Sequence, residues 1–368
     1  MKKTSIIIIS ALLYLSSPTS WASCAFENEA GYITSVKSLT MPITRVISVP
    51  PDVPVGNEIY RLKITLTDQG GIYVACTSPG QFYLGFKYAT TPLLPTAYSN
   101  TVYETGIPGI GVKFVRDNNA ADFPTTLSSA GCPASLGCFY GSGWNANSRL
   151  VFIKTASTVT GGVIDASQLP TALYSFGQSG NMIDVYKITL TGSLQINTPT
   201  CDISTVSQAM TVNMGNYHIS AFSGKGSATG WKNASIQLAN CGQFYGNVTS
   251  GYTGGTFNGT TTSTAGTRNN FLSVTLYPQN GTRSTTDAAN GIMKIDDGTP
   301  GATGVGIQLS SSESTSSLID LTTGITQILP KDGTRNITVP LYARYIQTEN
   351  SVTAGKANGR LEYVITYQ

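Results

Sequence analysis

Two polar segments in the first half of the sequence contain the residue types that bind sugars. One is Arg116–Asn119, and the other is Phe139–Asn147, which mixes aromatic side chains with amides. Carboxylates and planar amides pair with sugar hydroxyls, and an aromatic face covers the C–H side of the ring. The hypothesis is that Trp144 stacks on a sugar ring while polar groups around it bind the hydroxyls. The candidate residues are Asp117, Asn118, Tyr140, Trp144, Asn145 and Asn147.

The same residues have an interpretation without a ligand. The run Asp117–Asn119 is typical of a turn, because Asn and Asp are common there, and Trp144 is then a core or edge aromatic. Taken one residue at a time, this interpretation is the simpler one. In favour of the glycan site, a disulfide loop between Cys132 and Cys138 would stiffen the segment that follows it and reduce the ordering cost of binding.

Catalysis has little support in the sequence. The only histidine, His218, lies in the second half, so a Ser–His or Cys–His pair in the first half is impossible, and so is a histidine metal site there. The first half has enough acidic residues, among them Asp117, Asp122 and Asp165, for a glycosidase that uses two carboxylates. Their spacing in the sequence does not single out any pair. The sequence therefore predicts a protein that is not an enzyme and needs no cofactor.

The first 22 residues have the pattern of an export signal. Two lysines precede the apolar stretch Ile6–Leu15, which is too short to span a bilayer, and small residues flank Trp21 at the cleavage positions. Cleavage is expected after Ala22. The alternative is a lipoprotein with Cys24 acylated. Against it, Trp21 stands where such a signal has Leu, and one of six cysteines would lose its partner.

The charge of the chain argues against nucleic-acid and membrane partners. The formal net charge is +3, and removal of the two signal lysines lowers it to +1, with only 11% charged residues. A nearly neutral chain lacks the basic footprint of a nucleic-acid binder. No later apolar run is long enough for a membrane helix, so membrane insertion is not expected, and the length of the chain favours two domains.

Six cysteines in an exported chain predict disulfides. Six cysteines allow fifteen connectivities, and spacing alone does not choose among them. The simplest proposal pairs neighbours along the chain, as Cys24–Cys76, Cys132–Cys138 and Cys201–Cys241. Metal binding would need clustered cysteines such as a C-x-x-C pair, which the sequence lacks.

The mature sequence is predicted to be all-β. Short apolar runs alternate with Gly, Ser, Thr and Asn, and no helical period continues beyond the signal. The clearest strand alternates Tyr60, Leu62, Ile64 and Leu66 with polar residues. Further strands are expected at Ile72–Cys76, Phe82–Tyr88, Gly111–Val115, Leu150–Lys154 and Val185–Ile196. This density of short strands favours a sandwich with Greek-key connections.

A domain boundary is expected near Asn197–Thr200, because Pro199 cannot donate to a strand ladder. The predicted units are a signal at 1–22, a first domain at 23–196, a linker at 197–200 and a second domain at 201–368. The polar run Ser250–Asn270 is expected to be a surface loop. The chain ends on a strand, Arg360–Gln368, whose outer edge has no later strand to cover it, and such an edge needs a partner.

The second half resembles the pilin domain of chaperone–usher fimbriae. The resemblance rests on Cys201 with Ile236–Cys241, on Val212–Gly215 and Phe222–Gly226, and on the ending Leu341–Tyr345, Val352–Gly355 and Tyr367–Gln368. The family implies an incomplete immunoglobulin-like sandwich that a donor strand completes. A periplasmic chaperone lends a strand during export through an outer-membrane usher, and the next subunit's N-terminal strand replaces it in the fibre, by β-augmentation. The implied edge of the groove is Leu361, Tyr363, Ile365, Tyr367 and Gln368, with the terminal carboxylate held by basic residues of the chaperone.

A whole domain precedes this half, where a shaft subunit has only a short donor extension. The arrangement resembles a two-domain tip adhesin of type 1-like fimbriae, with an N-terminal lectin-like jelly-roll or immunoglobulin-like sandwich. The resemblance implies attachment to host surfaces from the fimbrial tip through a glycan or glycoprotein. The alternative is a structural or initiating minor subunit whose first domain binds a protein. No binding residue is carried over, because the first domain does not align residue by residue with the mannose-binding tip adhesin.

Overall fold

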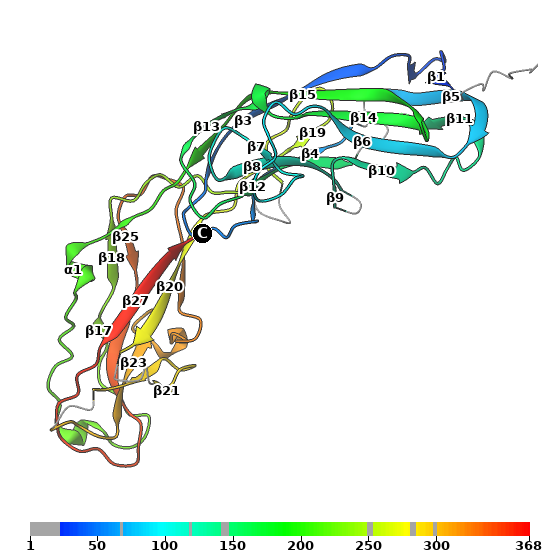
Figure 1. The fold of residues 1–368 in the computed structure, drawn as a ribbon. Helices are drawn as coiled ribbons and strands as arrows, with labels where there is room; N and C mark the ends of the chain where they lie inside the picture. The colour runs from blue at the N-terminus through cyan, green and yellow to red at the C-terminus, as the bar shows by residue number, and fades with distance from the viewer. Residues whose placement is uncertain are drawn as a thin grey trace, which may run out of the picture.

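The computed structural model describes residues 23–66, 69–117, 120–140, 147–248, 253–279, 285–296 and 300–368, and of Tyr140 it describes the backbone. The chain forms two β-rich domains arranged end to end in a bent, elongated shape (Figure 1). The predicted all-β class with two sandwich domains is confirmed.

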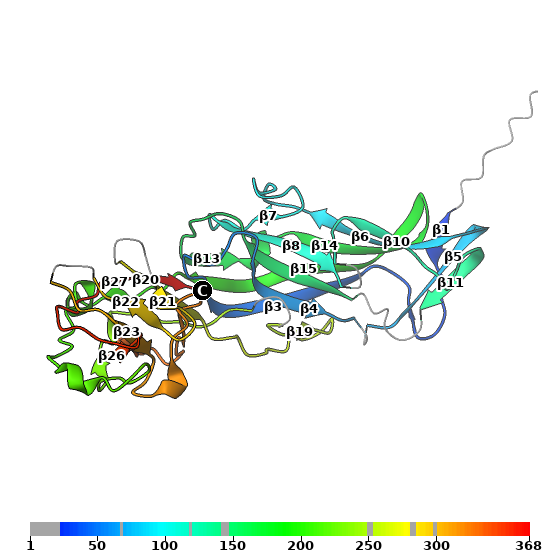
Figure 2. The ribbon, with the colours of Figure 1, turned by 90° about the horizontal axis from the view of Figure 1, so that it is seen from below.

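One of the three sheets in the N-terminal domain lies at the end farthest from the C-terminal domain (Figures 1 and 2). This distal sheet consists of β1 (Cys24–Phe26), β5 (Gly71–Gly80) and β11 (Ser135–Tyr140) in that order, with β2 (Tyr32–Ile33) beside β5. The disulfide Cys24–Cys76 joins β1 to β5, so two of its strands are covalently linked.

The other two sheets of this domain enclose its core. The long sheet has the order β10 (Thr125–Ser128), β6 (Phe82–Thr90), β14 (Thr171–Gln178), β15 (Asn181–Asn197) and β13 (Gly162–Asp165), with β3 (Lys37–Ser48) parallel to β15. The charged sheet has the order β19 (Thr256–Phe257), β4 (Glu58–Ile64), β12 (Ser148–Lys154), β8 (Ile110–Arg116) and β7 (Tyr103–Glu104), with β9 (Ala121–Asp122) beside β8. A 3₁₀ turn, η1 (Ala166–Gln168), follows β13.

The core between the long and charged sheets follows from strand alternation. In β4 the even-numbered residues from Tyr60 onward are buried, while Lys63 is exposed. Tyr88 of β6 meets Phe114 of β8 with ring centroids 6.2 Å apart, and Phe123 stacks on Phe114 at 5.7 Å. These edge-to-face and stacked pairs help to hold the two sheets together.

Most predicted strands of this domain lie inside the observed ones, with one correction at β4. The ladder between β4 and β12 runs from Glu58 to Ile64. The strand therefore begins two residues before Tyr60 and ends before Leu66, which is buried but unpaired in a ladder. Alternation predicted the buried face correctly and the limits of the pairing less well.

The C-terminal domain is a second sandwich with its own hydrophobic core. The first sheet has the order β16 (Asp202–Ile203), β18 (Ile236–Ala239), β25 (Ile337–Val339). The second has the order β17 (Lys232–Asn233), β26 (Tyr342–Gln347), β23 (Val305–Ser310), β22 (Ile292–Lys294), β21 (Thr285–Asp287). The third has the order β24 (Ile325–Ile328), β20 (Phe271–Pro278), β27 (Leu361–Tyr367). The short helical elements are α1 (Thr205–Gln208), η2 (Ile219–Ala221) and η3 (Thr315–Ser317). No helix in the part of the chain described here has the length and apolarity to cross a membrane.

The structure forms three disulfides, Cys24–Cys76, Cys132–Cys138 and Cys201–Cys241, which are the pairs proposed from the sequence. The pairing of Cys24 is incompatible with its acylation, so the lipoprotein alternative does not fit this structure.

A segment of the C-terminal half crosses into the N-terminal domain. The strand β19 pairs in parallel with β4, and the Thr65 N–H donates to the Phe257 carbonyl at 2.8 Å. Phe257 is 0% exposed and belongs to the N-terminal core. The prediction that Ser250–Asn270 is a surface loop is therefore wrong around β19, which is a strand that one domain adds to the other.

Candidate functional site

The two segments proposed to bind a glycan meet where β8 ends and β12 begins. Ser148 lies opposite Arg116 in the β8–β12 ladder, and the Asp117 N–H donates to the Asn147 carbonyl at 2.8 Å. Tyr140 is the last residue of β11, in the distal sheet. The remaining candidates, Asn118, Trp144 and Asn145, lie outside the described residues. The fold thus brings Asp117 and Asn147 together at the end of these two neighbouring strands, where β8 ends and β12 begins. This end of the sheet is here called the β8–β12 edge.

An arginine holds the carboxylate at this edge. Arg149 Nη1 lies 2.9 Å from Asp117 Oδ1, and the two side chains are 19% and 20% exposed. Partial exposure leaves the ion pair within reach of a ligand. A hydroxyl that arrives here finds a carboxylate acceptor and a guanidinium donor side by side, which is the combination that orients a sugar.

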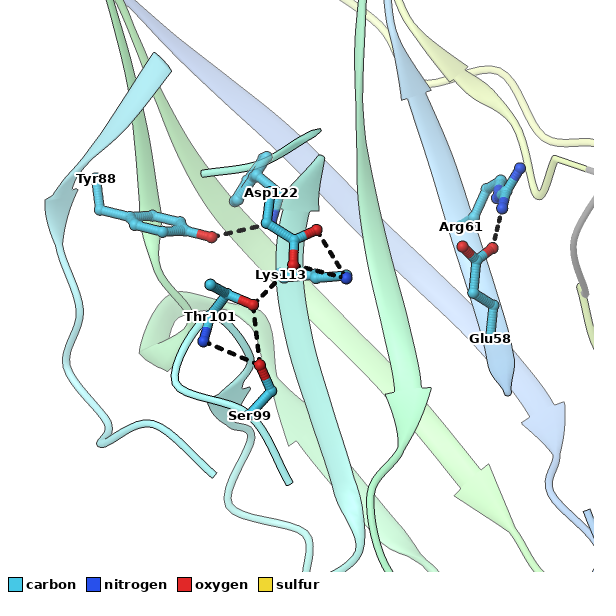
Figure 3. A network of polar contacts seen from close by, with 8 residues as sticks. Glu58, Arg61, Tyr88, Ser99, Thr101, Lys113 and Asp122 are labelled. Atoms are coloured by element: carbon cyan, nitrogen blue, oxygen red, sulfur yellow. Dashed lines mark hydrogen bonds and ion pairs between the residues drawn. The ribbon is translucent and has the colours of Figure 1, made fainter. Parts of the chain in front are cut away.

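Further ion pairs lie on the outer face of the charged sheet. Arg61 of β4 pairs with Glu58, and Lys113 Nζ of β8 lies 2.7 Å from Asp122 Oδ1. Figure 3 shows both pairs in one view. Lys63 is exposed and has no ion-pair partner among the residues that the structure describes. The outer face therefore carries fixed charges of both signs rather than one dominant charge.

The Asp122 carboxylate is already well occupied. Thr101 Oγ1 donates to Asp122 Oδ2 at 2.7 Å, and Ser99 Oγ lies 3.0 Å from Thr101 Oγ1 (Figure 3). Beside them the Phe114 N–H donates to Tyr88 Oη at 3.1 Å, and burial raises the pKa of Tyr88. This network fixes the loop around Ser99 against β8, so Asp122 serves structure more than ligand binding.

The groups considered for catalysis are each engaged with other partners. Asp117 and Asp122 pair with different cations, and Asp165 accepts from the Ser167 N–H at 2.9 Å. The hydrogen bonds from Ser167 lower the pKa of Asp165. His218 is exposed, with its Nδ1 2.8 Å from Ser220 Oγ. No group of three His, Cys, Asp or Glu side chains suited to a metal occurs within the described ranges.

Sequence reasoning missed the basic partners at this surface. Lys113 and Arg61 lie on predicted strands and Arg149 immediately precedes one, and all three occupy outward-facing positions of observed strands. The available signal is one charged residue among the outward positions of each of three strands, Arg61, Arg149 and Lys113. This signal does not identify the ion pairs by itself, because no local sequence pattern specifies that β4, β12 and β8 are neighbours in this order.

The distal sheet carries an exposed aromatic group, here called the distal aromatic patch. Tyr32, Tyr73 and Phe139 lie with ring centroids 5.8 to 6.5 Å apart, and Phe139 is 65% exposed. Leu136, on the same strand as Phe139, is 54% exposed. Clustered exposed apolar side chains of this kind mark interaction surfaces.

The C-terminal domain has an unpaired strand edge. β27 lies at the end of its sheet and pairs with β20. Across from it, the extended segment 209–215 half-buries Met210, Val212 and Met214 against the second core, and no ladder joins it to another described strand. The Tyr363 hydroxyl spans the gap by donating to the Ser207 carbonyl. Both segments thus pack apolar side chains against the second core, and neither has a ladder partner on this side within the described residues.

Comparison with known families divides the chain in the same way. The pattern of the MrkD-like receptor binding domain matches residues 39–193, and that of the fimbrial protein family matches residues 188–368. Neither description is that of an enzyme.

Individual proteins similar to this chain include a curated relative and two solved structures. A fimbria adhesin protein of Klebsiella pneumoniae is 27% identical over 371 residues, which is 100% of both chains. Among solved structures, the receptor binding domain of the plasmid-born adhesin MrkD1P of K. pneumoniae is 26% identical, with 50% of this chain and 100% of that chain covered and a TM-score of 0.36. The CupB6 tip adhesin of Pseudomonas aeruginosa is 12% identical, with 93% and 94% covered and a TM-score of 0.34.

Proposed function

From the premise that this chain is a two-domain fimbrial tip adhesin, with a MrkD-like receptor-binding domain followed by a fimbrial pilin domain, we propose that it attaches bacteria to a host glycan through the β8–β12 edge. The observation that carries this proposal is the main-chain hydrogen bond from Asp117 to Asn147, since it joins the two segments that we propose from the sequence as sugar-binding. The Asp117–Arg149 pair supplies an acceptor and a donor for hydroxyls. In the proposal, Trp144 stacks on the ring, and Asn118, Tyr140 and Asn145 add polar contacts.

The test is a glycan array probed with the mature chain from Ser23 to Gln368. The double substitution Trp144→Ala and Asn145→Ala and the single substitution Asp117→Asn are each expected to lower binding to the sugars that the unchanged chain recognises. Asp165→Asn is the matched control, because it alters an exposed carboxylate elsewhere in the same domain. Binding that survives both site variants would remove the β8–β12 edge from consideration.

The second part of the proposed function is anchoring by strand addition. In the proposal, the free edge of β27 and segment 209–215 flank an apolar groove that one extended strand fills. Main-chain hydrogen bonds to an edge give affinity, and alternate side chains fill the groove. In the proposal, a strand of a periplasmic chaperone occupies this groove until the protein reaches the outer-membrane usher. In the fibre, the N-terminal strand of an adjacent fimbrial subunit takes its place. Export through the periplasm then places the protein at the fimbrial tip on the cell surface.

The distal aromatic patch favours a second candidate function, in which the N-terminal domain binds a protein. Phe139 and Leu136 are exposed apolar side chains of β11. This strand lies at the far end of the molecule (Figure 1). Aromatic residues are enriched at the centres of protein interfaces. The variant Phe139→Ser with Leu136→Ser separates the two candidates. Loss of attachment to a protein-coated surface, with an unchanged glycan array, would favour the protein receptor.

A further inference from the structure

The main-chain groups of β27 point alternately toward β20 and away from it. Phe271 and Gln368 exchange two N–H···O=C bonds of 2.8 Å, and the Gln279 N–H donates to the Arg360 carbonyl at 2.8 Å. In an antiparallel pair the residues between such positions direct both main-chain groups to the other side. The main-chain groups of the odd-numbered residues of β27 therefore point away from β20, and these residues are Leu361, Tyr363, Ile365 and Tyr367.

One of these four positions is occupied by the N-terminal domain. The Tyr367 N–H donates to Asp52 Oδ2 at 2.8 Å. Within the described residues, no hydrogen bond reaches the main-chain groups of Leu361, Tyr363 or Ile365. The edge available to an added strand thus has three positions, and a carboxylate stands at its end.

Asp52 is held by a turn that belongs to the N-terminal core. Val53, next to it, is 6% exposed and packs in that core. Lys154, at the end of β12 and 1% exposed, donates from Nζ to the Pro51 carbonyl. Prolines at positions 50, 51 and 54 restrict the backbone of the turn. The carboxylate is therefore presented by a stiff element and not by a free side chain on a flexible loop.

We propose that Asp52 is the residue that ends the strand ladder on β27, so that an added strand pairs with Leu361–Ile365 and leaves the edge before Tyr367. This inference rests on the proposed strand addition. An added strand would need the Tyr367 N–H for one of its carbonyls, but that N–H is already used. The carbonyl would instead face a carboxylate, and two acceptors repel each other.

The occupant that fits is an extended peptide segment with apolar side chains at alternate positions. Where it passes Asp52 it must offer a donor, such as a main-chain N–H, a lysine or an amide, because the remaining lone pairs of the carboxylate accept. An acidic residue at that place is disfavoured by its charge. The adhesin domain itself thus contributes to the choice of the strand that completes the pilin domain.

The probe is the mature chain extended beyond Gln368 by a flexible Gly–Ser linker and one short strand of alternating valine and threonine. Amide hydrogen exchange is followed by NMR in the extended and unextended chains. Without the strand, the Tyr367 amide is expected to be protected, and the amides of Leu361, Tyr363 and Ile365 are expected to exchange freely. The strand is expected to protect these three.

The variants separate the role of Asp52 from strand addition itself. In Asp52→Ala, Tyr367 loses protection in the unextended chain and regains it in the extended one, because the ladder lengthens by one position. Asp52→Asn keeps an acceptor and is expected to behave like the unchanged chain, and Asp165→Ala is the control at a distant carboxylate.

Two results would overturn different claims. If the extended Asp52→Ala chain leaves Tyr367 unprotected while the other three amides are protected, Asp52 does not end the ladder. If no variant protects Leu361, Tyr363 and Ile365, the proposed strand addition fails. A thermal melt of each variant verifies that the two domains are folded.

Discussion

Phe257 of the C-terminal half lies opposite Ile64 of the N-terminal domain, in a parallel pairing that joins the two domains into one sheet. The Lys63 N–H donates to the Gly255 carbonyl at 3.0 Å, and the Gly254 N–H donates to the Arg61 carbonyl at 2.8 Å. A Cβ on Gly254 would lie 2.4 Å from the Tyr60 ring, so only glycine allows this approach. The pilin half therefore completes the edge of the receptor-binding domain.

Phe257→Ala is expected to destabilise the N-terminal domain by about 3–5 kcal/mol, because it removes a fully buried aromatic side chain and leaves a cavity. Urea unfolding of the mature chain, followed by a signal from the N-terminal domain, measures the effect. Phe139→Ala is the matched control, since Phe139 is 65% exposed, and its loss is expected to be within about 0.5 kcal/mol. Equal losses for the two variants would contradict the assignment of Phe257 to the core.

A fragment from Ser23 to Thr198 is expected to be less stable than the same domain in the full chain. The cut removes β19 and exposes the edge of β4, which then becomes a template for pairing with another chain. The fragment is also expected to self-associate, which analytical ultracentrifugation detects. A synthetic peptide of residues 253–265 is expected to raise its melting temperature. A monomeric fragment with the stability of the full chain would show that β19 is dispensable.

The two disulfides of the N-terminal domain are expected to differ in their contribution to stability. In the chain-entropy model Cys24–Cys76, with a separation of 52 residues, contributes about 4 kcal/mol, and Cys132–Cys138, with a separation of 6, about 2 kcal/mol. Paired cysteine-to-alanine variants, unfolded in urea, measure each contribution. If removal of Cys132–Cys138 lowers the free energy of unfolding more than removal of Cys24–Cys76, loop length is not the source of the stabilisation.

Stability is expected to fall steeply above about pH 10, because buried tyrosines keep their protons in the folded state. Burial raises the pKa of Tyr186 to about 12, and burial also raises the pKa of Tyr174. A raised folded pKa means that the unfolded chain loses the proton first. The stabilising effect is therefore complete below the unfolded pKa of about 10 and is lost as pH rises toward the folded value, by about 1.4 kcal/mol per pH unit for each tyrosine.

Unfolding free energies at about pH 9 and about pH 11 test this dependence. Tyr186→Phe is expected to make the decline shallower, although it also removes the hydrogen bond to the Gly70 carbonyl. Tyr98→Phe, at a residue that is 46% exposed, is the control. The same decline in both variants would argue against a role for Tyr186.

The sequence alone determined the class of the fold and the faces of its strands. The alternation from Tyr60 to Ile64 predicted a half-buried strand, and the same alternation from Leu361 to Tyr367 predicted the final edge strand. Both predictions succeeded because the two-residue repeat of a strand is a local property that neighbours in sequence express together. The three disulfides agree with the simplest pairing proposed from the sequence, but spacing alone does not select that pairing from the fifteen possible ones.

The tertiary structure alone decided which side chains meet. The residue type of Asp117 predicts a ligand-binding group, but its partner Arg149 lies on another strand whose position no local pattern specifies. Phe257 stood in a polar run and looked like part of a loop, and its pocket lies in a different domain. Asp52 and Tyr367 are 315 residues apart in sequence. Periodicity records how each strand is buried, whereas strand order and contacts between domains come from long-range pairing, which only the folded chain establishes.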